Sequence, residues 1–113
     1  MWPLPSLWFL EVNKGFLVKF SGAASRDIIG IYQYSFSNFG EEQADSYFLR
    51  MQTCLDVIQA NPEIGRLDTR VTPAIRRFDF ENHVIFYDVT ADYILVVRIL
   101  HHAMDFVKNL GTN

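Results

Sequence analysis

The sequence of 113 residues has little of several features that would reveal a function directly. It has a single cysteine, Cys54, which excludes an internal disulfide and is expected to be a buried, inert thiol at an apolar helix position. It has no glycine-rich phosphate loop, since Gly22, Gly30 and Gly40 are widely separated, and no Cys-x-x-Cys or His-x-x-x-His spacing. The sequence therefore predicts no cofactor and no metal site.

The chain also lacks a surplus of positive charge. It has 10 Lys and Arg against 13 Asp and Glu, for a formal net charge of −3. A protein that holds nucleic acid mainly through phosphates needs a dense basic surface, so direct specific binding of nucleic acid is not expected. With 50% hydrophobic and 20% charged residues, the composition is that of one globular domain that buries about two thirds of its unfolded surface.

No apolar segment at the N-terminus is long enough to span a bilayer. Residues 1–12 hold Trp2 and Trp8, but the segment contains prolines and lacks the basic start and small-residue cleavage site of a secretory signal. We expect no membrane contact and a cytoplasmic location, which suits a chain with one free thiol. Residues 1–14 are interpreted as an extension that precedes the domain.

What the sequence does contain is a regular order of apolar patterns. Residues 15–20 are typical of a short strand, and Ser21 is placed to cap a helix expected from about residue 22 to residue 38. Gly40 ends that helix, and a second helix with three-four apolar spacing, including Met51, Cys54 and Leu55, is expected from residue 41 to residue 60. The two helices should form an antiparallel hairpin that packs across a sheet.

The second half of the chain is typical of a strand meander. Residues 62–74 are expected to form a loop with a turn at Gly65-Arg66, and residues 76–105 hold three runs rich in Phe, Tyr, Val and Ile. The predicted fold is α+β, with the order β-α-α-β-β-β and the helical hairpin packed on a mainly antiparallel, four-stranded sheet. The domain is expected to span residues 15–108, followed by a frayed tail at 109–113.

One charge interrupts the last predicted strand. Side-chain alternation divides that strand into two sets, Leu95, Val97 and Ile99 on one face and Ile94, Val96, Arg98 and Leu100 on the other. If the helices cover the first face, the second is an open apolar surface around Arg98, and a partner is expected to cover it. The alternative is that Arg98 pairs with a neighbouring acid and lays its stem over the sheet.

Five motifs in this order resemble the ParE branch of the RelE/ParE toxins of bacterial toxin–antitoxin modules. They are Gln43-Ala44-Asp45, the Asn-Pro-Glu-Ile-Gly-Arg run of 61–66, Arg76-Arg77-Phe78, the His-Val-Ile-Phe-Tyr run of 83–87, and the Arg-Ile-Leu-His-His-Ala-Met-Asp run of 98–105. The resemblance covers about residues 16–106. The chain departs from the family in its first 14 residues, which are extra, and in Ala74, where the family often has Gly.

This resemblance implies a RelE-type fold and a small toxin of a type II module. It implies that a cognate ParD-like antitoxin wraps the toxin with its C-terminal segment, forming a hetero-oligomer, and that the target is DNA gyrase. We expect two sets of binding residues and no catalytic residue. The target-binding set is Arg66, Arg76, Arg98, His101, Met104 and Asp105; the antitoxin-binding set is Phe78, Ile94, Val96 and Leu100.

Two other functions remain open at this point. Relatives on the RelE side cut messenger RNA at the ribosome, and this chain has side chains of the types needed for acid–base chemistry and phosphate binding. These are Arg76, His83, Tyr87, Arg98, His101 and His102. Overall acidity fits poorly with a ribosome-binding nuclease, and adjacent His101 and His102 should point to opposite faces of a strand. A non-toxic interaction module would account for an apolar sheet face equally well.

Overall fold

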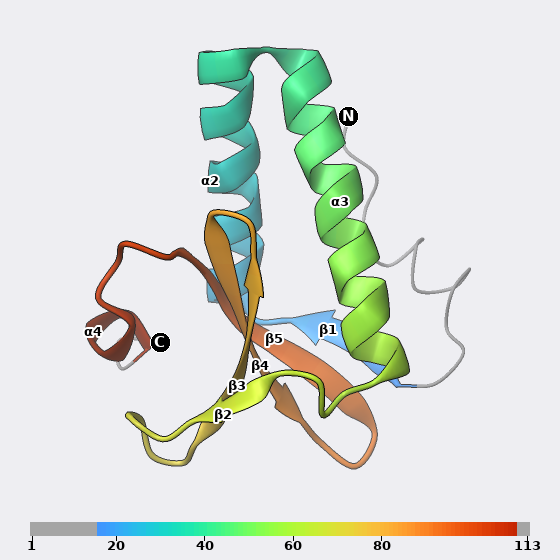
Figure 1. Cartoon of the computed structure of the whole chain (residues 1–113), viewed down its shortest axis with the longest axis vertical. Coiled ribbons are helices and arrows are strands. Elements are labelled where there is room, and N and C mark those ends of the chain that lie inside the picture. The colour runs from blue at the N-terminus through green and yellow to red at the C-terminus, as the bar shows by residue number, and fades with distance from the viewer. Residues whose placement is uncertain (1–15, 111–113) are drawn as a thin grey trace.

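The computed structural model describes residues 16–110, and the expected extension of residues 1–14 lies outside the described residues. The elements are β1 (Leu17–Phe20), α2 (Gly22–Phe39), α3 (Glu41–Ala60), β2 (Arg66–Asp68), β3 (Ile75–Phe80), β4 (His83–Val89), β5 (Tyr93–His101) and α4 (Phe106–Leu110), as Figure 1 shows. The predicted α+β class, the helical hairpin and the strand meander are confirmed. No helix within residues 16–110 is long and apolar enough to cross a membrane.

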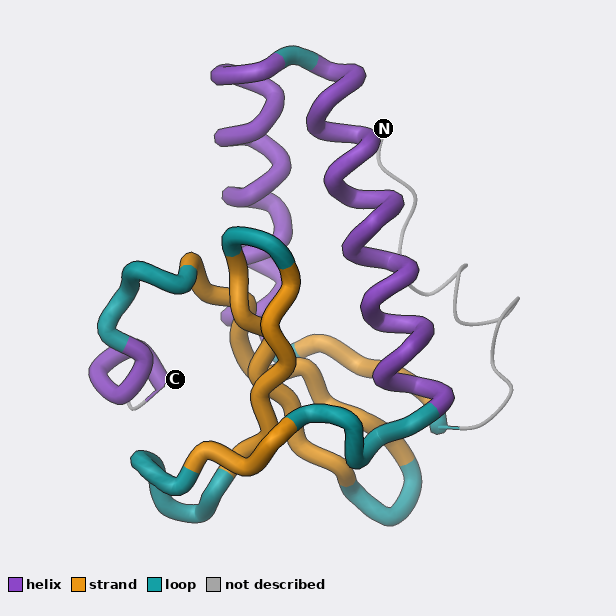
Figure 2. The backbone as a smooth tube through the Cα atoms, in the orientation of Figure 1, coloured by secondary structure: helices purple, strands orange, loops and turns teal. Residues whose placement is uncertain are grey.

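The described strands form one sheet of five strands in the order β1-β5-β4-β3-β2. β1 runs parallel to β5, and every other neighbouring pair is antiparallel. Figure 2 shows the strands gathered at one end of the helical hairpin. The prediction of four strands missed β2, which has only three residues and lies within the expected loop. Such a short edge strand has no periodic pattern of its own, because its pairing with β3 is its main reason to be extended.

The helical hairpin follows the local signals in the sequence. Ser21 caps α2, because its side-chain oxygen accepts the backbone N–H of Ala24 at 2.9 Å. Gly40 separates α2 from α3 and has a φ of 91°, a conformation that glycine adopts without the strain of a side chain. Figure 1 shows the two helices side by side, with the hairpin extending beyond the sheet.

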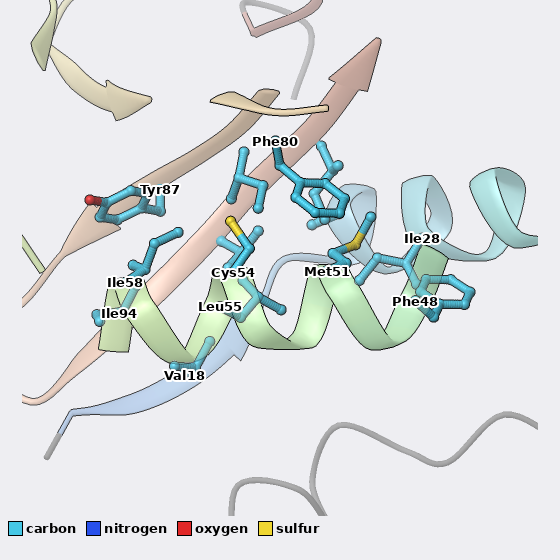
Figure 3. Close-up of a cluster of buried hydrophobic side chains, with 14 residues drawn as sticks. Val18, Ile28, Phe48, Met51, Cys54, Leu55, Ile58, Phe80, Tyr87 and Ile94 are labelled. Atoms are coloured by element: carbon cyan, nitrogen blue, oxygen red, sulfur yellow. The ribbon is translucent and has the colours of Figure 1, made fainter. Parts of the chain in front are cut away.

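One face of the sheet packs under the hairpin and forms the hairpin-side core (Figure 3). Its buried members are Val18, Ala24, Ile28, Phe48, Met51, Cys54, Leu55, Ile58, Phe80, Ile85, Tyr87, Ile94, Val96 and Ile99. The prediction that Met51 and Leu55 are buried is confirmed. Cys54 is buried as expected, and burial raises the pKa of its thiol to about 12, so the reactive thiolate is scarce at neutral pH.

The structure reverses the predicted faces of the first part of β5, whereas Ile99 lies under the hairpin and Leu100 on the opposite face, as predicted. Ile94 and Val96 are both 0% exposed and lie in the hairpin-side core, so the prediction that they belong to an open face is wrong. The register shows why: Phe86 pairs with Arg98 but the next residue, Tyr87, pairs with Val96. Val97 is therefore an extra residue in β5, and such a bulge changes the alternation of side chains along the strand.

The opposite face carries a smaller α4-side core, whose buried members are Ile75, Val84, Phe86, Val97, Leu100 and Phe106. Phe106 and Leu110 bring α4 onto this face, so Leu100 is covered within the chain itself. The predicted frayed tail from residue 109 is therefore wrong for its first two residues, because α4 continues to Leu110. A helix this short gives no readable period, and its docking depends on tertiary contacts.

Candidate functional site

A groove of about 680 Å³ lies between the hairpin and the end of β5. Its walls come from α2, α3, the turn between β3 and β4, and the end of β5 with the following turn. Apolar side chains such as Ile31, Phe39 and Met104 alternate with polar and charged ones such as Tyr47 and His83. We call it the histidine groove. A surface of this mixed character fits a peptide segment better than a small apolar ligand.

A tyrosine and a histidine meet on the wall of the groove. A hydrogen bond of 2.6 Å joins the Tyr47 hydroxyl to Nδ1 of His83, which connects α3 to β4. Burial, together with the nearby Glu81 carboxylate, raises the pKa of Tyr47 to about 12. Burial, followed by the influence of His101 and His102, lowers the pKa of His83 to about 4. Both side chains are therefore neutral at pH 7.

All three histidines of the chain gather at this end of the groove. The ring centroids of His83 and His101 are 5.5 Å apart, and those of His101 and His102 are 4.6 Å apart in a stacked arrangement. The prediction that His101 and His102 point to opposite faces is wrong, because β5 ends at His101 and His102 lies in the turn. Within residues 16–110, no cluster of His, Cys, Asp or Glu is arranged to hold a metal ion.

The turn between β3 and β4 is tied to α3 by an ion pair. The Arg50 guanidinium donates to both carboxylate oxygens of Glu81, at 2.7 and 3.1 Å. Glu81 has a φ of 52°, a left-handed conformation that is uncommon for a residue with a side chain. The pair is solvent-exposed and contributes little to stability, but it fixes the position of one wall of the groove.

Arg98 does not stand in the middle of an open face. Its side chain is only 15% exposed, and it donates to both oxygens of Asp27 on α2, at 2.8 and 3.0 Å. It also donates to the Asn109 carbonyl of α4 at 3.1 Å. The prediction of an exposed recognition arginine is thus wrong, and the alternative, pairing with a neighbouring acid, is correct. Hydrogen bonding to Asp27 raises the pKa of Arg98 above its ordinary value.

The reason for this pairing is the length of β1. Its register against β5 ends at Phe20 opposite Val96, so the edge of β5 beyond that point needs other partners. The Ser21 hydroxyl donates to the Val97 carbonyl at 2.7 Å, and Asp27 accepts the backbone N–H of Ile99 at 2.9 Å. α2 therefore completes the edge, and the Asp27 carboxylate is held where it meets Arg98.

The structure divides the predicted target-binding residues into two groups. His101 and Met104 line the histidine groove, and Asp105 directly precedes α4, where its carboxylate accepts the Lys108 N–H at 3.2 Å. Arg66 and Arg76 lie on β2 and β3, beyond β4 in the sheet order. The Arg76 guanidinium is bound to the Gly65 carbonyl at 2.6 Å and supports the loop before β2.

The predicted antitoxin-binding residues do not form an exposed surface. Ile94 and Val96 are in the hairpin-side core, Phe78 packs against the same core and is partly buried, and Leu100 lies under α4. The groove residues that sequence reasoning missed include Tyr47, whose position fits the three-four apolar spacing of α3. Nothing in a one-dimensional pattern distinguishes a tyrosine that faces the core from one at its margin.

The described domain is similar in sequence to known toxin proteins. A family model described as the ParE toxin of the type II toxin–antitoxin system parDE matches residues 18–106. The chain is 35% identical over 91 residues to "Toxin ParE1" of Mycobacterium tuberculosis, covering 80% of this chain and 93% of that protein. It is 31% identical over 93 residues to "Toxin ParE1" of Caulobacter vibrioides, covering 82% and 96% respectively.

A solved structure of the chromosomal ParDE TA system from P. aeruginosa has a similar fold. The TM-score is 0.65 at 20% sequence identity, and the match covers 74% of this chain and 92% of that chain. Likeness at this level of identity is evidence of the fold, which supports the arrangement of hairpin and sheet described above.

Proposed function

The chain belongs to the ParE toxin family of type II toxin–antitoxin systems, and from this premise we propose that it is neutralised by a ParD-like antitoxin and inhibits DNA gyrase. The observation that carries the proposal is the family match over residues 18–106, which includes nearly all of the described domain. Gyrase is the target that the ParE-type motifs imply, and inhibition would result from binding without any reaction catalysed by the toxin.

The antitoxin segment, in this proposal, occupies the histidine groove. The predicted alternative, the apolar face around Ile94 and Val96, is filled by the hairpin and by core contacts. The groove offers apolar contacts from Ile31 and Phe39 together with hydrogen-bonding groups on both walls. An amphipathic segment of a partner would bury its apolar residues there and pair its polar ones with the rim.

Gly30 offers a direct test of the antitoxin site. It lines the groove on α2, and a Cβ at this position would meet no other atom within 4 Å. Gly30→Phe should therefore fold normally, fill part of the groove and weaken binding of the cognate antitoxin at least tenfold in calorimetry. Gly30→Ala is the matched control and should bind normally, with a helix more stable by roughly 0.5–1 kcal/mol. Equal affinities for the two variants would place the antitoxin elsewhere.

The gyrase contact is proposed to involve the turn after β5, where His101 and Met104 are exposed beside the groove. Deletion of the chain from Ala103 onward is a poor test, because it also removes Phe106 from the α4-side core. Met104→Asp is cleaner, since its side chain is on the surface. It should relieve inhibition of purified gyrase in a supercoiling assay while antitoxin affinity changes less.

An RNA-cleaving activity of the RelE type is the second candidate, favoured by the Tyr47–His83 hydrogen bond beside His101. Two features count against it. Stabilising a phosphoryl transition state requires available cations, whereas Arg50 of the groove wall and Arg98 are paired with Glu81 and Asp27, which leaves Arg26 as the other arginine of the groove lining. The lowered pKa of His83 also makes it a weak general base near pH 7.

Two measurements separate these candidates and the non-toxic module. Purified protein should inhibit supercoiling by gyrase, and messenger RNA should remain intact in cells that express it. Cleaved transcripts with normal supercoiling would replace the gyrase proposal by the nuclease, with His83 and His101 as the first residues to substitute. If cells that express the protein without antitoxin grow normally, the non-toxic interaction module is the remaining candidate.

A further inference from the structure

The outer side of the helical hairpin, away from the sheet, carries exposed apolar side chains. Leu49 of α3 is 63% exposed, and Ile29 and Phe36 of α2 are 50% and 48% exposed. Ile29, Tyr32 and Phe36 recur at intervals of three and four residues and so lie on one side of α2. Tyr32 stacks on Phe48 of α3, with ring centroids 5.0 Å apart, so this side of α2 faces α3.

A matching line of residues runs along α3. It consists of Asp45, Leu49, Gln52, Asp56 and Gln59, again at intervals of three and four residues. Hydrogen bonds fix both ends of this line. Asp45 accepts a hydrogen bond of 2.8 Å from the Tyr32 hydroxyl, and the Gln59 side chain donates to the Phe16 carbonyl at 2.6 Å. The line therefore leads from the outer seam between the helices to the point where residues 1–15 join the domain.

We propose that residues 1–15 of this chain pack along this outer seam, against Ile29, Phe36 and Leu49. The segment has the chemistry to do so, because it contains the apolar residues Trp2, Leu4, Leu7, Trp8, Phe9 and Leu10. A single Trp side chain buries about 150–250 Å² when it is covered, which makes the two tryptophans strong anchors. The proposal goes beyond the toxin function and does not depend on it.

Chain length allows this packing. Fifteen residues in extended form reach roughly 50 Å, at about 3.3 Å for each residue. α3 has 20 residues and is about 30 Å long. A segment that starts beside Gln59 can therefore run the whole length of α3 and reach the exposed side chains of Leu49 and Phe36.

Asp56, a partly buried acid near the start of this path, also favours residues 1–15 as the segment that covers the seam. Oδ1 of Asp56 is buried and has no hydrogen-bond partner among the described residues. Asp56 is one turn before Gln59, which holds Phe16, and Lys14 precedes Phe16 by two residues. The segment would thus bring an ammonium group to a carboxylate with one buried oxygen that lacks a hydrogen-bond partner, and leaving such an oxygen unpaired costs free energy.

The packed segment would leave the histidine groove open. Gly30 and Tyr34 of α2 and Tyr47 of α3 line that groove, whereas Ile29, Phe36 and Leu49 do not. Antitoxin binding and N-terminal packing would therefore use different sides of the hairpin. The family model matches residues 18–106, and the relatives compared above align over almost their whole length with 91 to 93 residues of this chain, so the proposed covering segment would lie outside the shared domain.

Tryptophan fluorescence of the full chain tests the proposal, because Trp2 and Trp8 are the only two tryptophans. In the folded protein their emission should be blue-shifted from that of free tryptophan amide, and quenching by iodide should be slow. Leu49→Lys should shift the emission to that of free tryptophan amide while the far-UV circular dichroism stays native. Val57→Lys is the matched control, since Val57 is also exposed on α3 but lies off the seam, and its emission should not change.

Ile29→Lys repeats the test from α2 and should shift the tryptophan emission as Leu49→Lys does. Lys14→Glu tests the pairing with Asp56 and should shift the emission in the same direction, whereas the control Lys108→Glu should leave it unchanged. The proposal would be overturned if the unmodified protein had the emission maximum of free tryptophan amide. It would also be overturned if neither Leu49→Lys nor Ile29→Lys changed the emission maximum. Blue-shifted emission that disappears on dilution would also overturn it, because the segment would then pack on a second copy of the chain.

Discussion

The two faces of the sheet are held to their covering helices by different physics. The face under the hairpin is packed almost entirely with apolar side chains, and its main polar atom, the Tyr87 hydroxyl, is bonded to the Pro62 carbonyl and the Gly65 N–H. The face under α4 is anchored by a charge. The Arg77 guanidinium lies 5.7 Å from the ring centroid of Phe86 and 4.9 Å from that of Phe106.

Acidic partners complete the arrangement on the α4 side. Arg77 pairs with Asp79 at 3.1 Å and approaches Asp68 at 3.6 Å, while Arg70 also pairs with Asp68. Hydrogen bonding to Arg70 is the main reason that the pKa of Asp68 lies below its usual range. The hairpin side thus gains stability from buried area, and the α4 side from a few cation–π and ionic contacts around one short helix.

This difference indicates where the molecule can change shape. Opening the hairpin side would expose the larger core, whereas releasing α4 exposes a smaller one and leaves the hairpin in place. The proposed gyrase contact adjoins α4. The face with the weaker attachment is therefore the one that carries the proposed recognition turn.

The largest effect on folding is expected from a charge placed in the hairpin-side core. Val96→Asp should prevent folding, because an unpaired carboxylate at a fully buried site costs more than a domain with a total stability of about 5–15 kcal/mol can tolerate. Circular dichroism should show an unfolded chain. Val89→Asp, at an exposed position of β4, should stay folded, and a native spectrum for Val96→Asp would mean that the face assignment is incorrect.

A cavity on the same side should have the next largest effect. Leu55→Ala removes a buried side chain between α3 and the sheet and should lower the free energy of unfolding by about 2–5 kcal/mol. Val57→Ala, two residues along the same helix but exposed, should change it by less than about 0.5 kcal/mol. Urea denaturation measures both, and similar losses for the two variants would contradict the orientation of α3.

The α4 side should respond less, and more locally. Phe106→Ala removes the ring between Arg77 and Phe86 and should cost about 1–3 kcal/mol, because the site is at the margin of a small core. Amide hydrogen exchange in α4 should accelerate while exchange in α3 is almost unchanged. Val107→Ala is the exposed control. Faster exchange throughout the hairpin would show that the two faces are not independent.

The smallest expected effect is a pH dependence from the histidine groove. His83 binds a proton near pH 6.5 in the unfolded chain but only near pH 4 in the folded one, so stability should fall as the pH falls between these values. Because His83 is partly exposed, solvent screening reduces the expected loss between pH 7 and pH 5 to about 1 kcal/mol. His83→Gln should remove this component, and His102→Gln should retain it. A stability that rises toward pH 5 would contradict the sign.

Much of the fold was predictable because its signals are local. The cap at Ser21, the break at Gly40 and the apolar spacing of α3 each act within a few residues, and each prediction is confirmed. The site was less predictable. His101 and Met104 were identified by motif, but the Tyr47–His83 and Arg50–Glu81 contacts join elements far apart in the sequence.

The order of β1, the two hairpin helices and the three long strands follows from the sequence alone, as do the boundaries of α2 and α3 and the family, since capping, periodicity and motifs are properties of neighbouring residues. The side of β5 that each residue occupies, the pairing of Arg98 with Asp27 and the position of the histidine groove depend on tertiary contacts. Alternation divides a strand into two faces but does not say which face the helices cover. Here a bulge at Val97, visible only in the pairing of β4 with β5, shifts that alternation partway along the strand.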